Sequence, residues 1–229
     1  PALNNVTTAK NAFKNCMSLD KAIDLSSSEL VTAESALEGC VAFNKSLTID
    51  GPKVTDISDI LKGATSMSGD ITATLPLIQS LGDLFQSCKS VYNGKLTLNA
   101  ATLPSVEGLF KDCTALDTAP LLTLPVATSA KDLFKGCTSL NQELLIDLPK
   151  VQTYESALEG CTVFNSPLTV NGPEVTSVTN VLKDATSMSG DITATVPKLT
   201  QDIKSLFQSC KSIYNGKLTL NAATLPSVE

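Results

Sequence analysis

The sequence contains no histidine, arginine or tryptophan, and aromatic residues make up only 4% of its 229 residues. Histidine is the usual acid–base group near neutral pH and a frequent zinc ligand. Arginine is the side chain best suited to bind phosphate through two parallel hydrogen bonds. The sequence also has no glycine-rich phosphate loop and no serine or cysteine with a histidine to activate it. We therefore expect a protein that is not an enzyme and that holds no cofactor or metal.

Positive charge and long apolar runs are scarce as well. The 17 basic residues are all lysines, and 23 acidic residues bring the formal net charge to −6. A negative surface disfavours nucleic acid and anionic membranes as partners. No segment approaches the roughly 18 consecutive apolar residues of a membrane-spanning helix. We expect no nucleic-acid partner and no membrane insertion within this segment.

What the sequence does contain is a repeat of 24 or 25 residues, represented by the segment Leu47–Met67. Its landmark is a Phe or Leu, two residues, a Cys or Ala, two residues, and an apolar residue. A regular period of this length is typical of a solenoid, in which each coil is stable because it packs on the next. The central Cys or Ala lies at Cys16, Cys40, Ala64, Cys88, Cys113, Cys137, Cys161, Ala185 and Cys210.

The hydrophobic period changes halfway through each repeat. Apolar and polar residues alternate over Leu47–Asp50, which predicts a short strand with one face inward. Pro52 ends this strand, and from Val54 to Met67 the apolar residues recur at intervals of three and four, as in a helical or 3₁₀ segment. The pattern predicts a repeat solenoid of about nine repeats, with one parallel β-sheet plus short helical or 3₁₀ segments. A parallel β-helix with three sheets per coil is the alternative, and the weakest strand is expected near Pro120–Leu124.

The seven cysteines follow the repeat rather than a disulfide pattern. Alanine takes the same place in the repeat at Ala64 and Ala185. Alanine can replace a small buried side chain, but it cannot replace a disulfide partner or a metal ligand. We expect reduced thiols that face the interior, an expectation that leaves the redox compartment open.

A longer repeat is superimposed on the first. The segment Ala64–Thr74 recurs unchanged at Ala185–Thr195, and Lys95–Glu107 recurs at Lys217–Glu229, with offsets of 121 and 122 residues. This duplication indicates that the array grew by copying, and residues 1–229 are expected to form a single leucine-rich-repeat-like solenoid. Because both termini fall inside repeat units, we expect a fragment of a longer array, or copies that stack end to end.

The outward-facing strand positions are the candidate binding surface. Stacked in parallel strands, they predict a flat strip of hydroxyls, amides and a few carboxylates. Threonine is also a good strand former on a solvent face, which is the simpler explanation. A protein-binding or glycan-binding face and an ice-binding face are the functional alternatives. The candidate residues are Thr48, Asp50, Thr72, Thr74, Thr97, Asn99, Thr169, Asn171, Thr193, Thr195, Thr219 and Asn221.

Two tyrosines complete the candidate set. Tyr92 and Tyr214 occupy equivalent return turns, where the repeat gains its extra residue. A tyrosine at an exposed turn could anchor a partner, and it could equally cover the end of the neighbouring coil.

The step Leu109-Phe110-Lys111-Asp112-Cys113 and its counterpart at Leu133–Cys137 resemble the leucine-rich repeats of BspA-like bacterial surface proteins, in the variant of mycoplasma-type lipoproteins. The resemblance implies a right-handed solenoid, secretion or surface display, and adhesion or protein binding, and it implies no catalytic residue. The function expected from it is a non-enzymatic, extracellular or surface-displayed adhesion module that binds a protein or glycan on a host or neighbouring cell, or further copies of itself. The alternative is a structural spacer in a surface filament or virion fibre.

Overall fold

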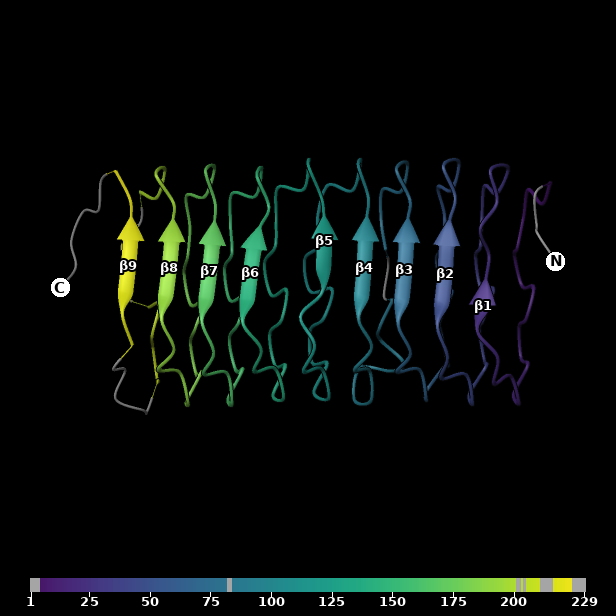
Figure 1. Ribbon diagram of the computed structural model, residues 1–229, viewed down its shortest axis with the longest axis horizontal. Helices are drawn as coiled ribbons and strands as arrows, with labels where there is room; N and C mark the ends of the chain where they lie inside the picture. The colour runs from purple at the N-terminus through teal and green to yellow at the C-terminus, as the bar shows by residue number, and fades with distance from the viewer. Residues whose placement is uncertain (1–4, 82–83, 201–202, 204, 211–215, 224–229) are drawn as a thin grey trace. The chain divides into compact units, whose positions relative to one another are not determined.

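The computed structural model describes residues 5–81, 84–200, 203, 205–210 and 216–223. In these residues each repeat forms one coil of a solenoid, with a short strand on one side and a series of turns on the other (Figure 1). The predicted repeat solenoid is therefore confirmed. Its strands are β1 (Ile23–Asp24), β2 (Leu47–Asp50), β3 (Ile71–Thr74), β4 (Leu96–Asn99), β5 (Leu121–Thr123), β6 (Leu144–Asp147), β7 (Leu168–Asn171), β8 (Ile192–Thr195) and β9 (Leu218–Asn221).

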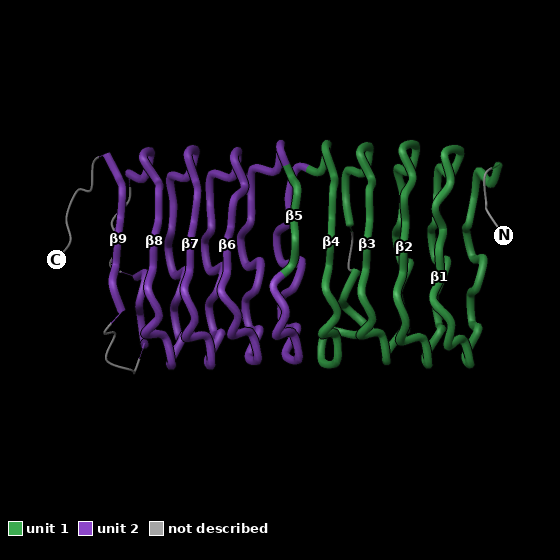
Figure 2. Tube along the Cα trace, viewed as in Figure 1, with its two compact units in different colours: residues 1–103, 120–124 green, residues 104–119, 125–229 purple. Residues whose placement is uncertain are grey.

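The chain divides into two compact units (Figure 2). Unit 1 comprises residues 1–103 and 120–124 and contains a five-stranded sheet in the order β1-β2-β3-β4-β5. Unit 2 comprises residues 104–119 and 125–229 and contains a four-stranded sheet in the order β6-β7-β8-β9. All strand pairs in both sheets are parallel and in register from one repeat to the next.

The prediction of one continuous sheet is wrong, because the strands belong to two sheets. The irregular strand expected near Pro120–Leu124 is present as β5, which is shorter than its neighbours and has two of its three residues exposed. Pro120 and Pro125 lie on either side of β5. Proline has no backbone N–H, so neither residue can donate a hydrogen bond to extend the ladder.

The predicted interior residues are confirmed. In β2, Leu47 and Ile49 are buried while Thr48 and Asp50 face outward, as the two-residue period requires. On the other side of the same coil, the residues spaced by three and four are all at most 3% exposed. These residues are Val54, Ile57, Ile60, Leu61, Ala64 and Met67.

The predicted helical segments are wrong, because the described residues contain no helix. In most coils the turn segment contains two residues with positive φ, four positions apart, for example Ser35 with Gly39 and Asp132 with Gly136. A residue in this left-handed region interrupts a right-handed helix, because its hydrogen-bonding direction no longer continues the previous turn. Glycine, asparagine and aspartate tolerate such a backbone better than other residues, and they occupy most of these positions.

The backbone hydrogen bonds of the turn segments alternate between two kinds of partner. The N–H groups of Ser35 and Leu37 donate to the carbonyls of Ser58 and Ile60 in the next coil, at 2.9 and 3.0 Å. Between them, the N–H of Ala36 donates within its own coil to the carbonyl of Ala33, at 3.1 Å. A helix would direct all of these donors along its own axis. Neighbouring coils are thus joined by backbone hydrogen bonds on the turn side as well as on the strand side.

Candidate functional site

The outward residues of the strands form two straight columns in each unit. In unit 1, Thr48 pairs with Thr72 and Thr72 with Thr97, so their side chains stack along the sheet. In unit 2, the same column consists of Thr169, Thr193 and Thr219. Neighbouring strands in such a sheet lie about 4.8 Å apart, so each column presents a hydroxyl at that interval.

The second column lies two residues further along each strand. It consists of Asp50, Thr74 and Asn99 in unit 1, followed by Asn171, Thr195 and Asn221 in unit 2. The structure thus brings the twelve predicted strand residues together into one polar face per unit. We call these two surfaces the strand face of unit 1 and the strand face of unit 2. Exposed members are Asp50, Thr72, Asn99, Thr193, Thr195, Thr219 and Asn221, and half-buried members are Thr48, Thr74, Thr97, Thr169 and Asn171.

Two leucines that sequence reasoning did not single out also belong to the threonine column. Leu121 pairs with Thr97 in unit 1, and Leu145 pairs with Thr169 in unit 2. Their exposed fractions are 55% and 62%, which is unusual for leucine on a polar face. The signal in the sequence is a doubled leucine, Leu121-Leu122 and Leu144-Leu145, at strand positions where most other repeats have one apolar residue and one threonine.

Tyr92 does not form part of this surface. Tyr92 is 0% exposed, and its ring centroid lies 4.2 Å from that of Phe85. It is therefore buried in the core beside Phe85, and its inclusion among the contact residues is wrong. An extra residue in the repeat can make the tyrosine side chain face the core instead of solvent. The sequence alone does not show which way this side chain faces. Tyr214 lies outside the described residues.

The charges of the coil are divided between its two sides. The lysines of the turn side form ion pairs with glutamates, such as Lys10–Glu34 at 2.7 Å and Lys135–Glu159 at 3.1 Å. In these two pairs the glutamate lies one repeat further along the chain, whereas in Lys53–Glu29 it lies one repeat earlier. The side-chain hydrogen bond to Glu159 is the largest effect that raises the pKa of Lys135. Among the described residues, the ion pairs include none of the strand-face carboxylates, which are Asp24, Asp50, Asp70, Glu143, Asp147 and Asp191.

The thiols are free and mostly face the interior, as predicted. Cys40, Cys88, Cys113, Cys137 and Cys161 are buried, and Cys210 is half-buried. Burial raises the pKa of Cys88 and Cys161, in each case to about 12, so they remain protonated and unreactive at neutral pH. Cys16 is exposed, which contradicts the prediction that all seven face inward. It lies in the first described coil, where no earlier coil among the described residues packs on it.

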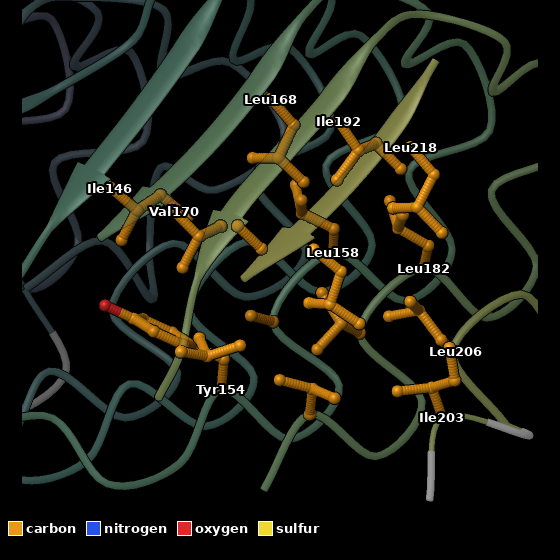
Figure 3. Close-up of a pocket in the computed structure, with 16 residues that line it drawn as sticks. Ile146, Tyr154, Leu158, Leu168, Val170, Leu182, Ile192, Ile203, Leu206 and Leu218 are labelled. Atoms are coloured by element: carbon orange, nitrogen blue, oxygen red, sulfur yellow. The ribbon is translucent and has the colours of Figure 1, made fainter. Parts of the chain in front are cut away.

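Within unit 2, a small apolar cavity lies between the strands and the turn segments (Figure 3). Its volume is about 40 Å³, and Val170, Val181 and Tyr154 are among the residues that line it. The equivalent positions of Val170 and Val181 in the first copy are Ile49 and Ile60, whose side chains are larger by one methylene. A cavity that holds benzene measures about 150 Å³. This one is too small for a metabolite, and the candidate site is therefore the strand face.

The described residues offer little for other kinds of site. They contain no group of three or more His, Cys, Asp or Glu side chains placed to hold a metal ion. Nor does any helix in this part of the chain have the length and apolar character needed to cross a membrane.

Comparison with known proteins identifies the family. A single family model, described as a Mycoplasma protein of unknown function, DUF285, matches residues 2–98, 55–171 and 128–223. The chain belongs to this family. The overlapping matches reflect the repeat, because each one spans several coils of the solenoid. No curated protein and no solved structure matches the chain significantly.

Proposed function

We propose that this member of the DUF285 family is a non-enzymatic binding module that contacts a protein or glycan through the strand faces of its solenoid. The observation that carries the proposal is the register of the strands, which stacks outward polar residues into two columns in each unit. A regular row of hydroxyls and amides on parallel strands changes little in shape on binding, so little conformational entropy is lost there.

The strand face also suits recognition because its outward residues do not have to fill the interior of the coil. Interior positions of the two copies differ conservatively, as Ile49 and Val170 do, because they must fill the coil. The outward position next to them changes from Asp50 to Asn171. Such freedom lets one fold present different chemistry on the same scaffold, as repeat proteins commonly do.

We further propose that the coil is a leucine-rich repeat of the BspA-like type and that the module acts outside the cell or at its surface. The support is the Leu-Phe-Lys-Gly-Cys step at Leu133–Cys137 together with the match to a Mycoplasma family. Adhesion to a host or neighbouring cell is the role that fits such a location.

A structural spacer in a surface filament or fibre is the second candidate. It is favoured by the backbone hydrogen bonds that join neighbouring coils on the turn side, as from Gly136 to Glu159 at 2.8 Å. Such cross-links stiffen a coil stack, and stiffness is what a spacer needs.

Sedimentation and cell binding of the purified chain distinguish the two candidates. A binding module remains monodisperse over a concentration series and, when fluorescently labelled, binds saturably to intact cultured animal cells. A spacer forms lateral or end-to-end assemblies and shows no saturable binding. The second pattern would replace the binding proposal with the spacer.

A further inference from the structure

The strand β6 (Leu144–Asp147) carries an apolar residue between two carboxylates on its outward side. Leu144 and Ile146 are 2% and 6% exposed, so they fix which side of β6 faces the interior. Glu143, Leu145 and Asp147 therefore occupy three successive outward positions, and all three are exposed. We call Glu143, Leu145 and Asp147 the β6 triad.

Leu145 departs from the chemistry of its own column. The residues that follow it in register on the neighbouring strands are Thr169, Thr193 and Thr219. The Leu145 side chain does not pack in the interior of the coil, because 62% of its surface is exposed. Burial of this leucine by a partner would remove apolar surface from water, which favours association.

The charges around Leu145 favour a basic partner. The outward side of the unit 2 sheet carries Glu143, Asp147 and Asp191, and none of them is in an ion pair among the described residues. The basic residue on this side is Lys217, whose backbone N–H donates to the Asp191 carboxylate at 2.8 Å. Several lysines of the turn side are in ion pairs, as Lys131 is with Glu155 at 3.0 Å. The described outward positions of the unit 2 sheet therefore carry more negative than positive charge.

We propose that the β6 triad anchors a basic polypeptide segment in which lysine or arginine side chains flank an apolar side chain. This inference rests on the proposed function and names the chemistry of its partner. Successive outward positions on a strand match alternate side chains of an extended segment, so one apolar residue and its two basic neighbours can meet Leu145, Glu143 and Asp147 together. Charge complementarity of this kind mainly sets specificity and association rate, while burial of the leucine adds affinity.

The test uses a labelled extended peptide with Lys, Leu and Lys at alternate positions, separated by serines, and a control peptide with Glu in place of Lys. Fluorescence anisotropy with the whole chain should show the lysine peptide binding at least tenfold more tightly than the control peptide at low salt. Leu145→Thr should weaken this binding at least tenfold without unfolding the protein, because threonine occupies the same column in β7, β8 and β9.

The charge variants supply the second readout. The double variant E143Q/D147N should bind more weakly and lose most of the salt dependence, whereas E107Q/E174Q removes two charges from outside the strand face and should leave binding unchanged. Equal binding of the two peptides, or unchanged binding by Leu145→Thr, would overturn the inference. If the chain binds cells but the lysine peptide neither binds nor competes, the partner chemistry is wrong while the binding module stands. If the chain does not bind cells, the proposed function fails first.

Discussion

Single residues in this solenoid both fill the interior of their own coil and bind to the neighbouring coil. The cysteines illustrate this most clearly. The thiol of Cys137 donates to the carbonyl of Phe110 at 3.1 Å, and the thiol of Cys161 donates to that of Phe134 at the same distance. Each bond reaches back into the preceding coil. Sulfur is a weak donor, which explains why alanine can stand at the same step at Ala64 and Ala185.

The buried thiols should make the protein sensitive to alkaline pH. Burial raises the pKa of Cys161 to about 12, whereas the pKa of a thiol in the unfolded chain is about 8.5. The folded state therefore retains protons that the unfolded state releases, and stability falls as the pH rises from about 9 toward 12. Urea unfolding of the wild type at pH 7 and pH 10 should show this loss, and Cys161→Ala should reduce it. The same pH dependence in both proteins would contradict the assignment.

Thiol labelling tests the same residues in the native state. At pH 8 a maleimide should modify the exposed Cys16 rapidly, whereas Cys113 and Cys137 should react only after denaturation, because both are 0% exposed. Rapid native modification of Cys137, detected by mass spectrometry of its peptide, would show that the interior position of the cysteine step is wrong.

The cavity in unit 2 predicts a stabilising substitution. Val181→Ile adds the methylene that Ile60 has at the equivalent position of the first copy, and it should raise the free energy of unfolding by about 1 kcal/mol. The matched control Ile60→Val removes a methylene from a buried site and should cost about 0.5–1.5 kcal/mol. Thermal unfolding measures both variants. If Val181→Ile lowered the free energy of unfolding, the cavity beside Val181 would be too small for the added methylene.

At the scale of the element, the conformation of the strand can be predicted from the sequence, whereas that of the turn segment cannot. The alternation over Leu47–Asp50 predicts both the strand and its inward face, because a two-residue period fits few other structures. The turn segment from Val54 to Met67 has the hydrophobic spacing of a helix and buries the predicted residues without forming one. Its conformation depends on left-handed residues such as Asp59 and Gly63, and on hydrogen bonds that its carbonyls accept from the preceding coil. Hydrophobic periodicity contains no information on either feature.

Substitution at a left-handed position tests this explanation of the turn segment. Gly136 has φ 75°, and a Cβ atom there would lie 2.6 Å from Oδ1 of Asp112. Gly136→Ala should therefore lower the free energy of unfolding by about 1–2 kcal/mol, whereas alanine would be favoured in a helix. Ser139→Ala, at an exposed neighbouring site, serves as the control. A stabilised Gly136→Ala variant would indicate a helical segment after all.

For the whole molecule, the coil has most of its ion-paired lysines on the turn side and an acidic, polar surface on the strand side. The lysine–glutamate pairs follow the repeat, since Lys53 pairs with Glu29 and Lys198 with Glu174 in the neighbouring coils, at 2.7 and 2.6 Å. The strand columns could be predicted from the repeat because threonine recurs at the same place in six of the repeats, at Thr48, Thr72, Thr97, Thr169, Thr193 and Thr219. The exposure of Leu145 and the burial of Tyr92 could not, because each depends on how one coil sits on its neighbour.

The most direct test of the strand face is a pair of triple lysine variants in unit 2. The strand-face variant carries Thr169→Lys, Thr193→Lys and Thr219→Lys, which place three bulky charges along one column. The control variant carries Ser139→Lys, Ser187→Lys and Thr200→Lys, which add the same charge at exposed positions outside that face. Saturation binding of each labelled protein to intact cultured animal cells should show at least a tenfold loss of affinity for the strand-face variant and wild-type affinity for the control. Equal affinity of all three folded proteins, or loss in the control variant alone, would contradict binding through the strand face.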